Sequence, residues 1–507
     1  MSNSTVVLSR RENQARLLAE YAIDFLSGRF GAIGTATLDR VAQFHLDSVG
    51  CAVSALSQGA RAPTVLRNEA LQHSPSRDSR GGIVFGSARP TDVSKAVAAN
   101  CSAVREWDSN GTNFGFDPIR GRTAGEFGHN DFYPVAIAAA RLVHLDGFKT
   151  LRVMLLIDEI RGRLAEVFAL RTYAIDHVHH GAVASVVAFS AAIGATVEQI
   201  ESAIGLVVAH YVPFRAIRAG HQLSDSKGAS AAFAAEIAIV SAMRAIRGFV
   251  GPRDVFRNPL AIYRFNEPTM DGTSPFDLEL GCSGDAFAIH GMHFKLGLYE
   301  HQSAGAIEAI CELFAIQPNL ACDQDSISQV RIKIYEPAYS IIADPAKRNP
   351  TTRQSADHSL PWIVARLFIK AKTAKSLDWN GLMLMPEDYQ EKHIIDPHVR
   401  RMIGKIVIEH GGPHYDSLYP DGIPTSVEIV HTLFGTLSSS LVHYPLGHAR
   451  SSPDKTEKMV HLKFDRLVAP TVSDVDGLRS RMRLVNKSAE EIDSFYAFPI
   501  LGCDPDQ

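Results

Sequence analysis

Alanine-rich segments with a helical repeat dominate the first half of this 507-residue chain, and they limit its possible folds more than any other feature. Apolar residues recur in them every three or four positions, which is the pattern of an amphipathic helix. The predicted helices span residues 13–28, 39–56, 92–104, 134–144, 151–168, 181–195, 197–210 and 228–247. Small side chains let helices pack closely, so we expect one large all-helical domain.

The pattern changes after residues 250–290, which are rich in Pro, Gly and Asn, as is typical of a surface connection. Alternation of apolar and polar residues predicts strands at 326–342, 425–435 and 438–447, with helices at 303–315 and 357–371 between and before them. The tail, 454–495, is again helical in pattern. The expected fold class is therefore mainly α with a smaller α/β domain. The expected domains are a helical domain at 1–290, an α/β lid domain at 291–446 and a C-terminal return to the helical domain at 447–507.

Composition narrows the class of function. The chain is 46% hydrophobic and 21% charged, with a net charge of −4. This balance gives no support to a nucleic-acid or membrane partner, and no stretch approaches the roughly 18 uncharged apolar residues that a membrane span needs. The six cysteines form no Cys-x-x-Cys pair, which disfavours structural zinc and iron–sulfur clusters. The N-terminus lacks a secretory pattern, and its Glu12 and Glu20 disfavour a mitochondrial transit peptide, so we expect a cytoplasmic protein.

One candidate site lies in the segment "REWDSNGTNFGFDPIRGRTAGEFGHNDFYP", which contains Asp108, Thr112 and His129. A carboxylate beside an imidazole can fix its tautomer and raise its basicity, giving a general acid or base near neutral pH. The alternative is that Asp108 belongs to a turn that caps a helix and that His129 is a surface residue.

Basic and hydroxyl-bearing residues recur at other predicted helix starts. The further candidates are His177 in "IDHVHHGAVAS", Lys227 in "SDSKGAS", Lys295 and His301 in "FKLGLYEHQSAG", and Tyr339 in "YEPAYSII", the last with Arg353, Asp357 and His358 in the loop that follows. Each has an ordinary alternative, such as a solvated lysine. Since helix N-termini favour anions and ligand sites favour domain junctions, the set together predicts a cationic pocket for a polyanionic small molecule.

Several of these segments resemble the MmgE/PrpD family, and the resemblance runs nearly from end to end. "LDSVGCAVSAL", "REWDSNGT…FGHNDFYPVAIAA", "IDHVHHGAVAS", "FKLGLYEHQSAGAIEA" and "VHYPLGHAR" are similar to family motifs. The resemblance implies a metal-independent lyase without a cofactor, usually a homodimer, whose active site lies between a large helical domain and a smaller α/β lid. The implied reaction is dehydration of 2-methylcitrate, or a close tricarboxylate, in the methylcitrate cycle of propionate catabolism.

Carried over by position, the resemblance implies roles for the candidate residues. His129, oriented by Asp108, would be the base or the acid of the reaction, and Lys227 and Lys295 would complete the catalytic set. Thr112, His177, His301 and Tyr339 would bind the substrate. No residue is expected to bind a metal.

The chain also departs from the family pattern near the predicted site. Gly111 replaces an acidic residue, Asn113 replaces an aromatic one, and Ser226 replaces a basic one before Lys227. The segment between Thr112 and His129 is longer than is usual in the family. The alternatives are therefore a cis-aconitate decarboxylase, another carboxylate lyase or epimerase such as an iminodisuccinate epimerase, or a non-catalytic protein that binds small acids.

Overall fold

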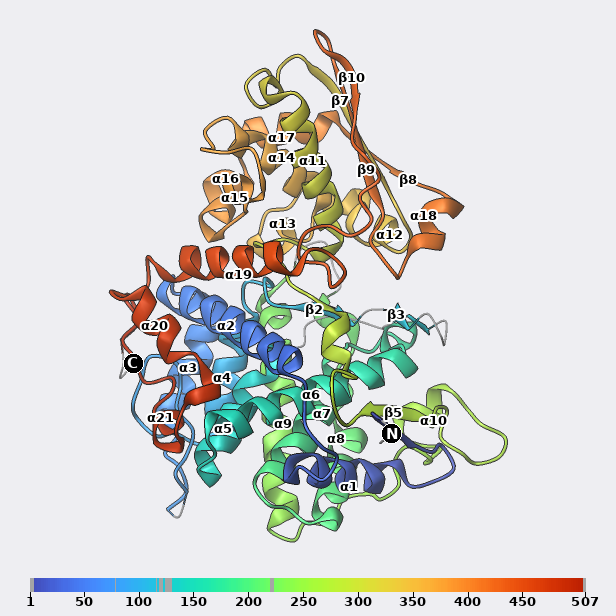
Figure 1. Cartoon of the computed structure of the whole chain (residues 1–507), viewed down its shortest axis with the longest axis vertical. Coiled ribbons are helices and arrows are strands. Elements are labelled where there is room, and N and C mark those ends of the chain that lie inside the picture. The colour runs from blue at the N-terminus through green and yellow to red at the C-terminus, as the bar shows by residue number, and fades with distance from the viewer. Residues whose placement is uncertain are drawn as a thin grey trace.

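The computed structural model describes residues 4–504 except 78, 115, 118–121, 124–129 and 219–222. Figure 1 shows an elongated molecule with a large helical part at one end and a smaller part containing helices and a sheet at the other. The chain is thus mainly α with a smaller α/β part, as its sequence predicts. Whether the smaller part acts as a lid, and where the domain boundaries fall, stay predictions.

The helical part contains the long helices of the first half of the chain. They are α1 (Gln14–Ser27), α2 (Thr35–Ser57), α3 (Arg61–Gln72), α4 (Val93–Arg105), α5 (Tyr133–Val143), α6 (Gly147–Val167), α7 (Val178–Ala192), α8 (Val197–His210), α9 (Asp225–Ile246) and the short α10 (Ile262–Asn266). All eight predicted helices of this region are present. Helix α3 was not predicted, because it is rich in polar residues and carries Pro63 near its start.

Three two-stranded ribbons accompany these helices. Strand β1 (Thr5–Leu8) pairs with β5 (Leu278–Gly281), β2 (Thr112–Phe114) with β6 (Met292–His293), and β3 (Phe116–Asp117) with β4 (Arg122–Thr123), all antiparallel. The β2–β6 ribbon joins the segment after α4 to the segment that leads into the α/β part.

The α/β part is built around a four-stranded sheet of order β10-β9-β7-β8. Its strands are β7 (Ile327–Ile334), β8 (Ile406–His410), β9 (Thr425–His431) and β10 (Gly435–Ser438). Strands β7 and β8 are parallel, and the other two pairs are antiparallel. Buried and partly exposed residues alternate along β9, as in a sheet covered on one face.

Helices connect and cover these strands (Figure 1). They are α11 (Ala304–Ile316), α12 (Ala338–Ile342), α13 (Arg353–Ala356), α14 (Leu360–Ala371), α15 (Trp379–Leu382), α16 (Glu391–Ile394), α17 (Pro397–Lys405) and α18 (Pro413–Leu418). Helix α11 packs on β9 and α17 on β7. Most of this covering layer follows β7 and precedes its parallel neighbour β8, because parallel strands need a long crossover.

All three predicted strands were too long. The strand expected at 425–435 ends at His431. The strand expected through Ile342 ends at Ile334, because Pro337 interrupts the ladder and the chain turns into α12. The strand expected at 438–447 is mostly irregular: β10 ends at Ser438, and Val442 makes only an isolated bridge to Thr425. Strand β8 was not predicted.

The C-terminal segment runs back along the helical part (Figure 1). It forms α19 (Pro453–Val468), α20 (Val475–Arg481) and α21 (Ala489–Asp493). Helix α19 packs against α2, and Lys463 of α19 forms a buried ion pair with Asp47 of α2 at 2.7 Å. The same Lys463 ammonium donates to the backbone oxygen of Lys295 at 2.9 Å, so the tail contacts a predicted site residue.

Helix α9 is long and apolar enough, by length and composition alone, to cross a membrane. In the structure it packs against α4, α7 and α8. Its Lys227 and Glu236 form ion pairs with Asp108 and Lys95. We therefore interpret α9 as a core helix of the helical part.

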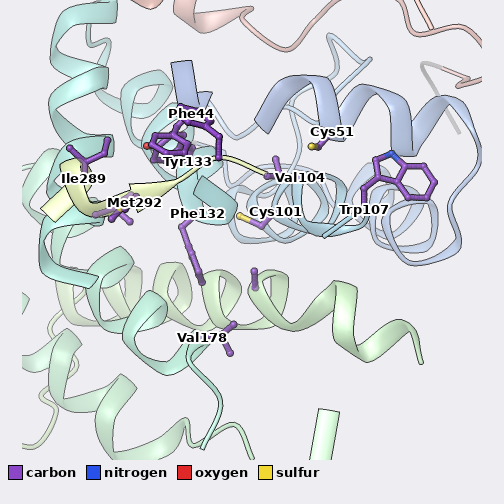
Figure 2. Close-up of a cluster of buried hydrophobic side chains, with 14 of the residues drawn as sticks. Phe44, Cys51, Cys101, Val104, Trp107, Phe132, Tyr133, Val178, Ile289 and Met292 are labelled. Atoms are coloured by element: carbon purple, nitrogen blue, oxygen red, sulfur yellow. The ribbon is translucent and has the colours of Figure 1, made fainter. Parts of the chain in front are cut away.

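A buried apolar cluster holds the segments that lead to the predicted site (Figure 2). Phe44 of α2 stacks on Phe294 with ring centres 3.8 Å apart, which fixes the residue just before Lys295. Trp107, 5% exposed, follows α4 and directly precedes Asp108. Lys295 and Asp108 each follow a well-packed aromatic residue in the chain, which limits their movement.

Candidate functional site

A pocket lies between the helical part and the α/β part. Its wall comprises Arg105, Asp108, His177, Arg215, Leu223, Lys227, Lys295, Glu300, Gln302, Ile341, Lys347 and His358. The first seven come from the helical part and the segment that leaves it, and the last five from the α/β part. Five Lys and Arg side chains, two histidines and two carboxylates line this pocket, so its charge suits an anionic ligand.

Asp108 is the centre of the buried charges in this wall. Its Oδ1 lies 2.6 Å from Nη1 of Arg105 and 3.0 Å from Nζ of Lys295. Its Oδ2 lies 3.1 Å from Nζ of Lys227 and 3.1 Å from Nε2 of His358. Burial alone would raise the pKa of Asp108, but Arg105, Lys295, Lys227 and His358 outweigh burial and hold that pKa well below its usual value. Asp108 is therefore a permanent anion at neutral pH.

The backbone places this carboxylate where the cations meet. Asp108 has φ 49°, in the left-handed region that few residues other than glycine adopt, although Asp tolerates it better than most. The residue follows the C-terminal end of α4, where its N–H donates to the oxygen of Arg105 at 2.9 Å. This turn directs Asp108 toward Lys227 and Lys295 from other elements.

A second buried carboxylate, Asp357, extends the network. Its Oδ1 accepts from Nζ of Lys227 at 2.9 Å, and its Oδ2 accepts from Nη1 of Arg353 at 3.1 Å. Nδ1 of His358 lies 2.6 Å from Oδ1 of Asp357. Lys227 therefore bridges Asp108 and Asp357, and so joins a carboxylate of the helical part to one of the α/β part.

Lys295 is buried as deeply as Asp108. Its ammonium donates to the backbone oxygen of Asp108 at 2.8 Å and to its Oδ1 at 3.0 Å. Burial lowers the pKa of Lys295, and the Asp108 carboxylate opposes that change. The geometry favours a fixed ammonium that neutralises negative charge.

His177 stands at the start of α7, where Arg161 fixes its ring. Nη2 of Arg161 lies 2.9 Å from Nδ1 of His177. Because arginine can only donate, Nδ1 must accept, and the ring hydrogen belongs on Nε2. His177 is thus set as a hydrogen-bond donor through Nε2, which lies 3.7 Å from Oδ1 of Asp176.

Of the candidates, the structure brings Asp108, His177, Lys227, Lys295 and His358 together in the pocket wall. His129 falls outside the described residues. Thr112, His301 and Tyr339 do not line the pocket.

Thr112 and His301 are buried beside the pocket wall. Thr112 pairs with His293 across the β2–β6 ribbon, and its Oγ1 has no hydrogen-bond partner among the described residues. His301 stacks on His293 with ring centres 4.9 Å apart, and His293 stacks on His448 at 4.0 Å. Burial, with smaller contributions from His448 and Lys295, holds the pKa of His301 well below its usual value, so the ring is neutral.

Tyr339 lies elsewhere in the α/β part. It is 38% exposed and belongs to α12, and its ring faces His410 at 5.9 Å. It lines a separate surface groove with Ser340 and Arg348. The change from strand to helix at Pro337 turns Tyr339 away from the pocket and directs Ile341 toward it.

Several pocket residues were missed from the sequence. Arg105, Arg215, Glu300, Gln302 and Lys347 line the wall but were not predicted. For Arg105 a signal existed, because it stands three residues before Asp108 and so shares its side of a helical turn. Glu300 and Gln302 flank His301. The sequence alone does not indicate in which direction the side chains of this one-turn 3-10 helix point.

Asp108, Asp357 and His358 form the group of potential metal ligands found among the described residues, with ligand atoms within 4.8 Å of one another. Lys227 is bonded to both carboxylates. A divalent cation at this point would have to replace its ammonium and lie close to the other cations of the wall, so these residues fit a metal poorly.

Two family models and several curated proteins are similar to this chain. The MmgE/PrpD N-terminal domain matches residues 16–269, and the MmgE/PrpD C-terminal domain matches residues 299–485. An alkylcitrate dehydratase, phiI, of a fungal species is 23% identical over 488 residues, covering 89% of this chain and 87% of the relative. The 2-methylcitrate dehydratase of Salmonella typhi is 23% identical over 446 residues, covering 82% and 83%. That of Escherichia coli K12 is 24% identical over 319 residues, covering 62% of each chain. The chain belongs to the MmgE/PrpD family.

Proposed function

We propose that this protein is a hydro-lyase that dehydrates 2-methylcitrate, or a close tricarboxylate, to the corresponding aconitate-type product. The observation that carries the proposal is the pocket wall, in which five Lys and Arg side chains accompany two carboxylates. A tricarboxylate brings a comparable excess of negative charge. The names of the curated relatives, which are dehydratases of alkylcitrate and 2-methylcitrate, support the same class of reaction.

The chemistry explains why such a wall is needed. Dehydration removes a proton from the carbon beside a carboxylate and expels a hydroxyl from the next carbon. The transition state gathers negative charge on that carboxylate, and fixed cations lower its free energy more than they lower that of the substrate. Lys227 and Lys295 suit this role because their ion pairs with Asp108 hold them in place before the substrate arrives.

The remaining roles follow from the same wall. Nε2–H of His177 would donate to a substrate carboxylate. His129 keeps its implied role as the base or the acid, on the resemblance alone. Among the described residues, Asp108 contacts Lys227, Lys295, Arg105 and His358, so we assign it the role of positioning the two lysines.

The test is turnover by purified, chelator-treated protein with 2-methylcitrate, citrate and cis-aconitate in separate reactions. The expected result is a conjugated double bond, seen as ultraviolet absorbance, with 2-methylcitrate. Carbon dioxide from cis-aconitate would replace the proposal with a decarboxylase. No reaction with any of the three would contradict a tricarboxylate lyase.

A homodimer is part of the same proposal, on the resemblance. Sedimentation velocity at micromolar concentration tests it, and a single species of 55.3 kDa would contradict it.

A further inference from the structure

Glu300 differs from the other carboxylates at the pocket. It is 7% exposed and lines the wall, yet no basic nitrogen of the described residues lies within 4 Å of its carboxylate. Asp108 and Asp357, in contrast, each contact at least two cations. Glu300 is therefore a buried acid without an ion pair, in a pocket where basic groups outnumber acidic ones.

The backbone holds Glu300 in one position. It caps the 3-10 turn His301–Ser303, where its Oε2 accepts from the N–H of Gln302 at 2.8 Å. Its own N–H donates to the backbone oxygen of Asp357 at 2.7 Å. Its other oxygen, Oε1, has no hydrogen-bond partner in the described part of the chain. One oxygen is thus anchored, and the second remains able to exchange a proton with a ligand.

The surroundings make both protonation states of Glu300 accessible near neutral pH. Burial raises the pKa of Glu300 to about 7, although Lys295 and the N–H of Gln302 act in the opposite direction. A bound polyanion would add negative charge beside this carboxyl and raise its pKa further. In the complex Glu300 is then expected to be a neutral carboxylic acid.

The neighbouring groups suit proton donation less well. Asp108 is held as an anion by its cations. Both ring nitrogens of His358 contact carboxylates, and Nδ1 of His177 is occupied by Arg161. Among the described groups of the wall, Glu300 is the acid that is both anchored and unpaired.

We propose that Glu300 is the general acid that protonates the departing hydroxyl, an inference that rests on the proposed dehydration. The base takes the proton from the carbon beside the carboxylate, and that electron pair forms the carbon–carbon double bond. The carbon–oxygen bond breaks, and its electron pair takes the proton of Glu300, so that water leaves. Glu300 is left as a carboxylate and regains a proton from solvent before the next turnover.

The test is the variant Glu300→Gln, which keeps the shape of the side chain but cannot donate an acidic proton. It is assayed on 2-methylcitrate and on an analogue in which fluoride replaces the departing hydroxyl. Fluoride leaves without protonation, so only the natural substrate needs the acid. We expect kcat on 2-methylcitrate to fall by about 10²–10⁴-fold. On the fluoro analogue, the fold-loss in kcat should be at least about ten times smaller.

Glu312→Gln is the matched control. Glu312 lies on α11, which follows the same turn, and it contacts Ser440 away from the pocket. This variant should keep both activities. Unfolding temperatures of all three proteins show that the variants are folded.

The outcomes separate this inference from the proposed function. Full activity of Glu300→Gln on 2-methylcitrate, or equal losses on both substrates, would overturn the role of Glu300 while the dehydratase stands. A wild-type enzyme that is inert toward 2-methylcitrate would overturn the proposed function itself, and the acid role with it.

Discussion

The turn after α4, residues 106–110, and the turn at residues 300–303 face the same pocket, but their carboxylates lie in different electrostatic surroundings. In the first, Asp108 contacts Arg105, Lys227 and Lys295 and remains ionised. In the second, Glu300 has no cation within ion-pairing distance among the described residues, and burial raises its pKa to about 7. The turn that holds Asp108 therefore supplies fixed charge, whereas the turn that holds Glu300 supplies a group that can change its charge. Catalysis by proton transfer next to carboxylates needs both.

The largest effect is expected from Lys227→Met, which removes the bridge between the two parts of the molecule. Asp108 and Asp357 would lose a shared buried partner at 3.1 and 2.9 Å. Loss of one partner from a buried ion pair costs about 3–5 kcal/mol, and we expect that decrease in the free energy of unfolding measured in urea. Turnover should fall by about 10²-fold or more.

The control for that variant is Lys149→Met. Lys149 pairs with Asp146 at 3.4 Å on the surface, with its side chain 61% exposed. Pairs of this kind contribute about 1 kcal/mol or less. Equal destabilisation by the two variants would show that the buried network contributes no more than a surface pair.

Asp108→Asn should alter how stability depends on pH. The pKa of Asp108 is lower in the folded protein than its unfolded value of about 4. Such a group stabilises the fold at pH above the unfolded pKa, and this contribution is lost as pH falls through the folded pKa. The difference in unfolding free energy between wild type and variant should therefore be largest near neutral pH and shrink below about pH 4. A difference that is independent of pH, in a titration monitored by circular dichroism, would contradict the fixed charge.

A smaller effect is expected from Lys347→Ala at the half-buried edge of the pocket. Its charge attracts the substrate but is partly screened by solvent, so its removal should cost about 1 kcal/mol, or about fivefold in KM, with kcat little changed. The increase in KM should diminish at high salt. Exposed Lys372→Ala is the control, and an equal change in both variants would mean that only the overall charge matters.

The smallest effect is expected from Tyr339→Phe. Because Tyr339 lies on a separate groove, loss of its hydroxyl should change activity by about twofold or less, as is usual for exposed positions. A loss of tenfold or more in kcat, at unchanged unfolding temperature, would show that α12 turns this hydroxyl into the pocket during turnover.

Much of the helical part could be predicted from the sequence, because its amphipathic repeats are local. Residues at its helix ends, such as Lys227 and His177, could be identified as candidates for the same reason. The directions of side chains in short irregular segments could not. Glu300 and His301 are adjacent, and only the packing of their turn decides that the first lines the pocket and the second is buried. Tyr339 lies on α12, where the alternating pattern predicted a strand.

The most direct test of the central claim is a crystal structure with a bound tricarboxylate such as citrate, at neutral pH. The claim is that the pocket between the two parts grips such a ligand through its fixed cations. The predicted result is carboxylate oxygens of the ligand within hydrogen-bonding distance of Lys227, Lys295 and Nε2 of His177. A tricarboxylate bound elsewhere, for example in the groove beside Tyr339, with this pocket filled only by water, would contradict the account.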